Sequence, residues 1–402
     1  MELKRILLIV PGERQKGACG VVDYAFQMAV AAARDGTEVL MLPLYPLGEA
    51  ETHFLENLPA DLRPLITLQE VSGSNVMDRI RQFDDEVERF RPDCISLQFY
   101  PKLFKTGRRY LPALKELAQV LHRWPVTVTL HETWTKLGEG GVGCLLRKWI
   151  RTRDLKKGLA LLNPKMVLVS NDRHFQEVTK AGFAAEMLPI ISNIGRADLP
   201  EGMDLSSLLK VMAPEETLPE RPLSVLFFAR IIPTWDPVPF VSALRAQAAK
   251  EGKSPLIISV GETGYGDQGW LQLQKAAPGL VCIKLGKRPA DEISWLLQTC
   301  EWGFSPTPVD FWMKSSSCAA MVTHELPIVF SAGAFNTAPP PDSWTTDGSG
   351  FHSSKLSLCK GNHVTCVNEV WKKFSARVAC LCFSPPIYPA ARKGSADQQG
   401  GS

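Results

Sequence analysis

Short apolar runs rich in Val, Ile and Leu recur along the chain, separated by amphipathic segments that are long enough for helices. Continuous apolar runs are typical of strands buried on both faces, and their alternation with helices indicates parallel sheets. The predicted strands of the first half are Arg5 to Val10, Glu38 to Leu42, Cys94 to Leu97, Val126 to Leu130, Met166 to Val169 and Glu186 to Leu188. The predicted helices are Val21 to Arg34, Asn75 to Phe90, Tyr110 to His122 and Arg173 to Ala181. This pattern predicts a doubly wound α/β domain over residues 1–194.

The same alternation returns in the second half after a break. Residues 195–221 are rich in Gly, Pro and acidic residues without a buried run, so they form the predicted linker. The next predicted strands are Leu223 to Phe228, Leu256 to Val260, Val281 to Leu285, Trp302 to Ser305 and Pro327 to Phe330. The helices among them are Pro237 to Lys250, Gln268 to Ala277, Ala290 to Thr299 and Ser315 to His324. The predicted fold class is α/β, with two Rossmann-like, doubly wound parallel-sheet domains (1–194 and 222–338) facing a cleft.

Composition and charge narrow the class of protein. With 402 residues, 45% of them hydrophobic, the chain has room for two or three cores, which excludes a disordered or fibrous protein. Residues 351–402 hold seven basic and two acidic residues, which gives this segment a net charge of +5. Because the whole chain has a net charge of +3, the residues before 351 have a net charge of −2. A near-neutral body argues against nucleic acid as a partner, because such binding needs clustered cations. No run approaches the roughly 20 apolar residues of a membrane span, and the cysteines of the body are scattered, so we expect a cytoplasmic protein.

Two places in the first domain are candidates for chemistry. Gly17 and Gly20 lie in the loop between the first strand and its helix, where backbone N–H groups can approach an anion. The spacing Gly-x-Gly-x-x-Gly is absent, and an ordinary flexible loop fits as well. His131 and Glu132 follow the strand Val126 to Leu130 at a carboxyl edge, where the histidine could donate to a substrate hydroxyl and the glutamate could act as a base or a cap. A structural histidine is the alternative, although the strand-end position favours a functional one.

Cations and serines mark the second domain. Arg230 follows its first strand, and a guanidinium suits phosphate because its donors form a planar fork. Lys314 precedes a helix that opens with Ser315 and Ser316, where hydroxyls, backbone N–H groups and the positive helix end favour an anion. A surface ion pair and a simple helix cap are the respective alternatives. We predict a phosphate site from Arg230, Lys314 and this helix start.

The last part of the chain differs from the rest. Residues 339–402 contain proline clusters and a closing Gly/Ser/Gln run, so we expect an atypical, poorly ordered tail. Its Cys and His residues lack the spacing of a compact zinc site, and no metal site is predicted anywhere. Residues 371–383 could form one amphipathic helix, either packed on the body or attached weakly to an anionic membrane.

These residues together resemble the GT-B glycosyltransferases of the large retaining family 4, over about Lys4 to Ser331. The resemblance is carried by the glycine loop ending in Gly17-Ala18-Cys19-Gly20, by Arg91-Pro92-Asp93 before a strand, and by Leu130-His131-Glu132. In the second half it is carried by Phe228-Ala229-Arg230, Val260-Gly261-Glu262 and Leu285-Gly286-Lys287. The resemblance implies that Arg230, Lys314 and the helix start at Ser315 and Ser316 hold the diphosphate of a nucleotide sugar. It further implies that Gly17, Gly20 and Gly261 belong to the donor site, that His131 contacts the transferred sugar, and that backbone near Gly286 and Lys287 meets the base.

The resemblance also implies an activity. We expect a transferase that moves a sugar from a nucleotide-diphosphate donor to a saccharide or lipid-linked acceptor, with retention, no obligatory metal and no cofactor beyond the donor. We expect it in the cytoplasm, with a peripheral contact at the inner face of the membrane as an additional expectation.

Three departures from the family pattern support a rival hypothesis. Trp235 stands where the family usually has a Lys after the Arg. The paired glutamates of the family would fall near Trp312 and Ala320, and neither residue is acidic. The closing helices that cross back to the first domain in the family are not recognisable. The alternative is therefore a degenerate GT-B protein that binds a sugar nucleotide or a partner without turnover. A sugar-nucleotide epimerase is a weaker third hypothesis.

Overall fold

The structure is a computed structural model. It describes residues 3–12, 20–46, 58–100, 104, 110–132, 142–188, 190–192, 194–228, 230–231, 233–306, 315–330, 345–346, 352–353, 372 and 374–376.

The first sheet has seven parallel strands in the order β3-β2-β1-β4-β5-β6-β7. The strands are β1 (Arg5–Val10), β2 (Glu38–Pro43), β3 (Ile66–Leu68), β4 (Cys94–Phe99), β5 (Val126–Leu130), β6 (Met166–Val169) and β7 (Ala185–Met187). Residues of β1, β4 and β5 are almost all buried, which explains their continuous apolar runs. The chain adds strands outward in one direction from β1 and in the other from β4, so the topological switch point lies between these two strands.

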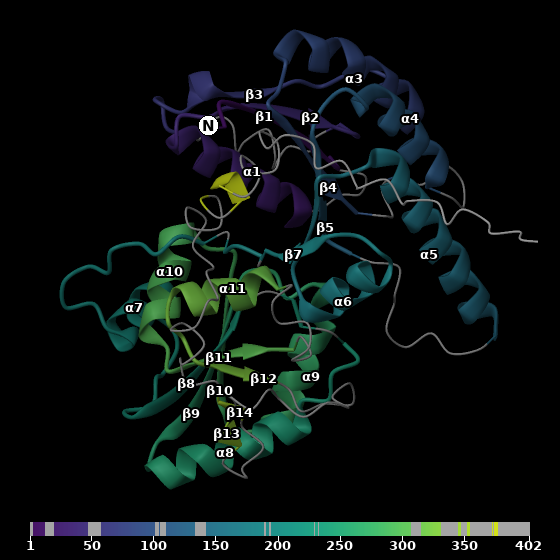
Figure 1. Cartoon of the computed structure of the whole chain (residues 1–402). Helices are drawn as coiled ribbons and strands as arrows, with labels where there is room; N and C mark the ends of the chain where they lie inside the picture. The colour runs from purple at the N-terminus through teal and green to yellow at the C-terminus, as the bar shows by residue number, and fades with distance from the viewer. Residues whose placement is uncertain are drawn as a thin grey trace, which may run out of the picture.

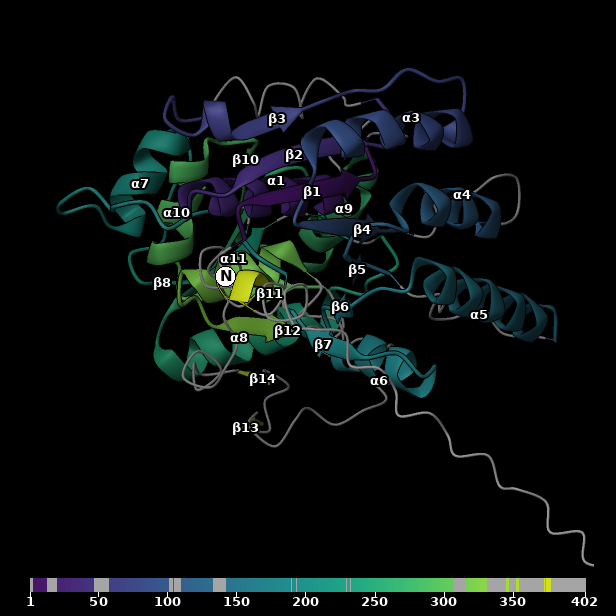
Figure 2. The same ribbon diagram turned by 45° about the horizontal axis from the view of Figure 1, so that its top comes forward.

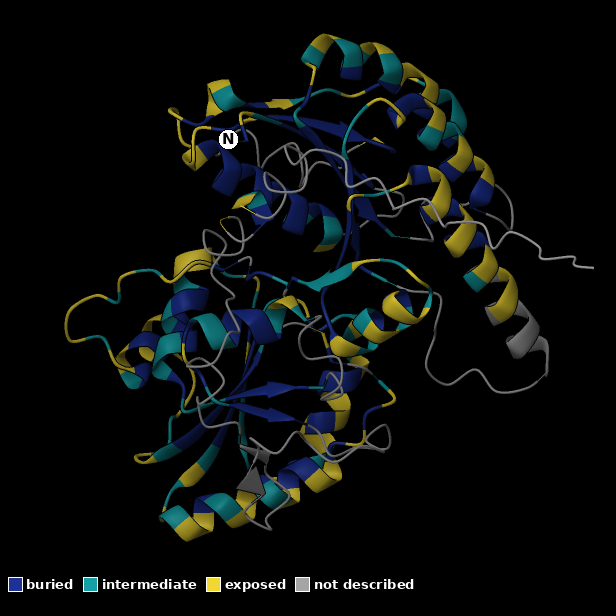
Figure 3. Ribbon diagram, viewed as in Figure 1, coloured by how far each residue is buried: buried dark blue, intermediate teal, exposed yellow. Residues whose placement is uncertain are grey.

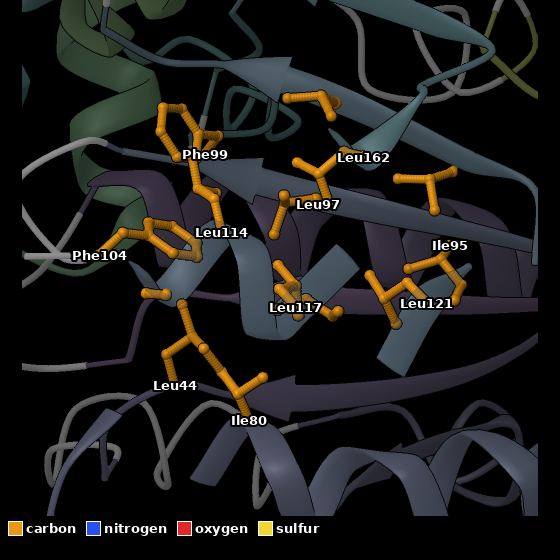
Figure 4. Packing of buried hydrophobic residues seen from close by; sticks show 14 of the residues in the cluster. Leu44, Ile80, Ile95, Leu97, Phe99, Phe104, Leu114, Leu117, Leu121 and Leu162 are labelled. Atoms are coloured by element: carbon orange, nitrogen blue, oxygen red, sulfur yellow. The ribbon is translucent and has the colours of Figure 1, made fainter. Parts of the chain in front are cut away.

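Helices cover both faces of this sheet (Figures 1 and 2). They are α1 (Gly20–Arg34), α3 (Val76–Phe90), α4 (Leu111–Leu121), α5 (Val142–Leu162) and α6 (Asp172–Lys180). The apolar side of α1 packs in the core on one face, whereas α3, α4, α5 and α6 supply buried residues to the other face. Figure 4 shows part of this second core, where Ile80 of α3 and Leu117 of α4 point towards Leu97 of β4.

The second sheet joins five parallel strands to an antiparallel pair, in the order β10-β9-β8-β11-β12-β14-β13. The strands are β8 (Pro222–Phe228), β9 (Ser254–Val260), β10 (Val281–Gly286), β11 (Trp302–Ser305), β12 (Ile328–Phe330), β13 (Thr345–Thr346) and β14 (His352–Ser353). Its helices are α7 (Leu205–Met212), α8 (Val238–Glu251), α9 (Gln268–Ala276), α10 (Ala290–Thr299) and α11 (Ser316–Thr323). Helices α7, α10 and α11 pack on one face, and α8 and α9 on the other. The predicted α/β class with two doubly wound parallel-sheet domains is confirmed.

Five of the described α-helices and strands lie outside those predicted from the sequence: β3, α5, α7, and the two-residue strands β13 and β14, which fall within the predicted tail 339–402. The short strand β3 extends the first sheet, and α5 follows β5. Helix α7 lies within the predicted linker 195–221: its N-cap Asp204 accepts from the Ser207 backbone N–H at 2.7 Å, and Leu208 and Leu209 are buried in the second core. The cap and the apolar spacing therefore make this part of the predicted linker a packed helix.

The segment that enters the second domain is fixed to it by a hydrogen-bond chain. The Ala197 N–H donates to Ser294 Oγ at 2.8 Å, and the Ser294 hydroxyl lies 2.8 Å from His324 Nε2. The His324 Nδ1 atom lies 2.7 Å from the Ala320 carbonyl, which makes Nδ1 the donor and Nε2 the acceptor. Because Ser294 and His324 are buried, this chain ties residue 197 to both α10 and α11.

One residue of the last part of the chain packs in the first domain. Phe374 is 2% exposed and belongs to the core cluster that contains α1 residues such as Val22 and Phe26. Figure 1 shows the short helical piece around it, in yellow, beside α1. The chain therefore returns from the second domain to the first, although no closing helix is recognisable in the sequence and residues 339–402 are predicted to be a poorly ordered tail.

Candidate functional site

The carboxyl edges of the two sheets carry most of the predicted site residues that the structure describes. In open α/β sheets, ligands bind outside the carboxyl ends of the strands at the switch point. In the first sheet this edge holds the start of α1 and His131, which follows β5. In the second sheet the switch point lies between β8 and β11, with Arg230 beyond the end of β8 and Ser305 at the end of β11. The geometry thus makes these two edges the candidate site.

His131 is held from two sides. It is 5% exposed, and its Nε2 atom lies 2.8 Å from Gln98 Oε1, while Gln98 Nε2 donates to Ser96 Oγ at 2.9 Å. The amide orientation of Gln98 therefore makes His131 Nε2 a donor, and in the neutral ring Nδ1 is then the acceptor. The ring also meets Tyr24 of α1 edge to face, with centroids 5.1 Å apart, and burial raises the pKa of Tyr24. Gln98, which the sequence patterns did not single out, sets the tautomer of the predicted sugar-contacting histidine.

The glycine loop is described only at its end. Gly20 is the first residue of α1 and is exposed, and a Cβ atom added there would meet nothing within 4 Å. Gly17 lies outside the described residues. Gly20 therefore stands at the helix start near the switch point, with open space in front of it.

Arg230 is an exposed cation at the second edge. Its neighbour Ile231 donates its N–H to the Thr263 carbonyl at 2.9 Å, which ties the segment after β8 to the segment after β9. Gly264 lies directly against the Arg230 side chain, because a Cβ added to this glycine would come within 3.1 Å of Arg230 Cγ. The glycine thus leaves room for the arginine stem, and the guanidinium lies at the exposed edge.

An ion pair between Lys287 and Glu262 lies near Arg230. Lys287 Nζ and Glu262 Oε1 are 2.8 Å apart across the ends of β10 and β9. The hydrogen bond from Lys287, and to a smaller extent the charge of Arg230, lower the pKa of Glu262. Gly261 and Gly286 join the same two strand ends, with the Gly261 N–H donating to the Gly286 carbonyl at 2.7 Å and both backbones at positive φ. Arg230, Gly261, Gly286 and Lys287 are therefore gathered at one edge.

The serines at the start of α11 have local partners. Ser315 Oγ accepts from the Cys318 N–H at 3.3 Å as the N-cap and lies 2.9 Å from Ser317 Oγ. Cys318 Sγ donates to Ser305 Oγ at 3.1 Å, which joins the helix start to the end of β11. Ser316 is exposed, whereas Lys314 lies outside the described residues. The helix start therefore lies at the switch-point edge, and the Ser315 hydroxyl serves as the cap.

Trp235, which stands in the place of a family lysine, is a core residue. It is 8% exposed and packs against Phe304, Phe227 and Phe240, with ring centroids 4.8, 5.9 and 5.9 Å away. Ala320, near one expected glutamate position, is fully buried in α11, and Trp312 lies outside the described residues. The position of the family lysine is thus occupied by a residue that builds the core and adds no charge at the edge.

A large cavity lies elsewhere. It has a volume of about 1200 Å³ and opens at the amino-terminal edge of the first sheet, between Arg5, Asp93 and Lys372. The Asp93 carboxylate is already occupied by the Lys4 and Arg5 backbone N–H groups at 2.9 Å each. Because α/β folds bind ligands at the opposite edge, this cavity is not the candidate site.

Nowhere in the described ranges do three His, Cys, Asp or Glu side chains gather as a metal-binding group. Within the same ranges, every helix is too short or too polar to cross a bilayer.

Two doubly wound parallel-sheet domains define the class: the chain has the GT-B fold, and a solved glycosyltransferase shares this arrangement. A glycosyltransferase from Rickettsia africae ESF-5 is 12% identical with a TM-score of 0.56, over 94% of this chain and 93% of its own. A putative UDP-N-acetylglucosamine 2-epimerase from Listeria monocytogenes is 8% identical over 81% and 78%, with a TM-score of 0.48. WaaG, a glycosyltransferase involved in lipopolysaccharide biosynthesis, is 11% identical over 94% and 92%, with a TM-score of 0.45. No protein-family model and no curated protein matches the chain, and at these identities the likeness to solved structures concerns the fold alone.

Proposed function

We propose that this chain is a cytoplasmic glycosyltransferase that moves a sugar from a nucleoside-diphosphate donor to a saccharide or lipid-linked acceptor. The observation that carries the proposal is the placement of Arg230, exposed at the switch-point edge of the second sheet beside Gly264. A guanidinium there can neutralise charge that develops on a leaving diphosphate. The GT-B fold shared with a glycosyltransferase supports the reaction class.

Each part of the site has its own role in binding the donor. Arg230 and Lys314 hold the diphosphate, helped by the N-terminal end of α11 with Ser315 and Ser316. Gly261 lets the chain approach the donor closely, and backbone near Gly286 and Lys287 contacts the base. On the first domain, the start of α1 with Gly17 and Gly20 approaches the same phosphates, and His131 contacts the transferred sugar.

Transfer proceeds with retention of the anomeric configuration and without an obligatory metal. The protein's own cations replace a divalent ion, because charge-assisted contacts from Arg and Lys stabilise the leaving diphosphate directly. Activity that stops in a chelator and returns with magnesium or manganese would refute this part of the proposal.

A second candidate is a GT-B protein that binds a sugar nucleotide or a partner without turnover. The aromatic packing of Trp235 favours it, because a phosphate cation of the resembled family is replaced by a core residue. A panel of nucleotide sugars separates the two candidates: transfer or donor hydrolysis establishes the enzyme, and calorimetric binding of a donor without either establishes the binding protein. Failure of every nucleotide diphosphate to bind would refute the enzyme and the sugar-nucleotide-binding form of the second candidate.

A further inference from the structure

Helix α5 exposes apolar and cationic side chains together. Trp149 is 58% exposed, Ile150 37% and Leu161 47%. Arg153, Lys156 and Lys157 are exposed on the same helix. At 100° per residue, these six positions fall within an arc of about 140°, so they form one face, which we call the outer face of α5. Figure 3 shows this helix at the margin of the first domain, with much of its length exposed.

The opposite face of α5 fixes this orientation. Leu155, Leu159 and Leu162 are buried in the core of the first domain. Gly158 allows α4 to come close, because a Cβ added there would lie 2.2 Å from Leu114 Cδ1. The helix cannot turn its exposed apolar residues inward without losing this packing.

The charge of α5 indicates what the outer face meets. Three cations, Arg153, Lys156 and Lys157, are exposed on this face. The single acidic residue of the helix, Asp154, borders this face next to Leu161 but is only 2% exposed. The Arg153 guanidinium lies over the Trp149 ring, 5.5 Å from its centroid. One exposed aromatic ring and two exposed aliphatic side chains thus lie beside three cations, whereas the acidic side chain is buried. This combination matches an interface that is anionic at its surface and apolar just below.

We infer that the outer face of α5 docks the protein on an anionic lipid surface. Trp149, Ile150 and Leu161 enter the boundary between headgroups and acyl chains, and the cations bind the lipid phosphates. Nucleic acid fits less well, because its phosphate backbone offers no apolar layer for Ile150 and Leu161. This inference does not rest on sugar transfer, and it places the membrane contact on α5 instead of on residues 371–383.

The test is co-sedimentation of the full chain with vesicles of phosphatidylcholine alone or mixed with phosphatidylglycerol. We expect binding to the mixed vesicles only, weakened by salt. The pairs Lys156→Glu with Lys157→Glu, and Trp149→Ser with Leu161→Ser, should each weaken that binding at least about tenfold. The matched control is Leu271→Ser with Lys275→Glu, an exposed apolar residue and an exposed cation on α9 of the second domain, which should bind as the parent does.

Three results would overturn the inference: equal binding to neutral and anionic vesicles, no binding to either, or unchanged binding by both α5 variants. Unchanged binding by both α5 variants would show that another part of the chain makes the membrane contact. Capture by an anionic oligonucleotide without vesicle binding would assign the face to nucleic acid. Thermal unfolding and calorimetric titration of nucleotide should be unchanged in all variants, so failure here is distinguishable from failure of the proposed sugar transfer.

Discussion

His131 Nε2 lies 2.8 Å from Gln98 Oε1, across the adjacent strands β5 and β4. Because both side chains are buried, the amide fixes the ring in one orientation and one tautomer. Because Nε2 of His131 donates to Gln98, this ring nitrogen is not available to a substrate. The consequence is that Gln98 acts through His131, as a positioning residue.

The first prediction concerns this pair. Replacing His131 by Ala should lower kcat by about tenfold, as expected for the loss of a hydrogen bond to the transferred sugar, with little change in nucleotide affinity, because the second domain holds the base and phosphates. Gln98→Leu should lower kcat less, and in the His131→Ala background it should lower kcat no further. Steady-state kinetics and calorimetric titration give both quantities. Equal losses of turnover and nucleotide affinity in His131→Ala would show that the histidine supports the fold or the phosphates.

The second prediction concerns the donor diphosphate. Each charge-assisted contact contributes roughly 1.5 to 3 kcal/mol, so Arg230→Ala or Lys314→Ala should weaken donor binding about tenfold to a hundredfold. The matched control is Arg245→Ala on α8, whose guanidinium donates to the Pro278 carbonyl at 2.6 Å in the same domain. Isothermal titration with the nucleotide diphosphate measures the affinities. Unchanged affinity in both site variants would remove the phosphate assignment.

The third prediction concerns Trp235. Introducing the lysine of the resembled family with Trp235→Lys should fail to improve donor binding and should destabilise the second domain by at least about 3 kcal/mol, because it removes a large aromatic side chain and buries a charge. Trp235→Phe keeps most of the aromatic packing and should cost less. Denaturant unfolding provides the comparison. A stable Trp235→Lys variant that binds donor more tightly would show that the side chain reaches the phosphates.

Much of this architecture could be predicted from the sequence, because buried parallel strands have continuous apolar runs. The run before Arg230 is one example: all but the two ends of β8 are buried. Helix α7 was predictable too, since Asp204 and the apolar spacing of Leu205, Leu208 and Leu209 form a capped amphipathic pattern.

Other features could not be predicted in this way. Helix α5 was missed because its outer face mixes Trp149, Ile150 and Leu161 with cations, which erases the helical period of its buried side. The role of Gln98 depends on a partner 33 residues away, and that of Phe374 on a core built from the start of the chain. Such pairings depend on the tertiary fold, which local patterns do not encode.

The fourth prediction concerns pH. Burial lowers the pKa of His324 from its ordinary value of about 6.5, and the positive charge of Arg196 acts in the same direction, against the carbonyls of Ala320 and Gly195. The unfolded chain therefore binds this proton at a higher pH than the folded chain does. Its contribution to stability is full above about pH 6.5 and is lost as the pH falls from there towards the lowered folded pKa.

His324→Gln should therefore reduce the fall in unfolding free energy between pH 7 and pH 5. Denaturant unfolding at a series of pH values measures this dependence. His122→Gln, at an exposed position after α4, is the matched control and should keep the parental dependence. The same pH dependence in His324→Gln as in the parent would contradict the assignment.

The last prediction concerns Phe374, which lies in the core of the first domain although the chain reaches it only after the second domain. Phe374→Ala should destabilise the first domain by about 3 to 5 kcal/mol, since it leaves a cavity where a fully buried ring was packed. Lys372→Ala, at an exposed position of the same short helix, should be within about 0.5 kcal/mol of the parent.

The proline-rich composition after Pro339 predicts rapid cleavage from about Thr337, whereas the packing of Phe374 predicts a protected fragment around residues 374–376. Limited proteolysis with mass spectrometry separates the two expectations. If the whole segment from Thr337 is digested at once and Phe374→Ala unfolds at the parental denaturant concentration, the ring does not contribute to the core.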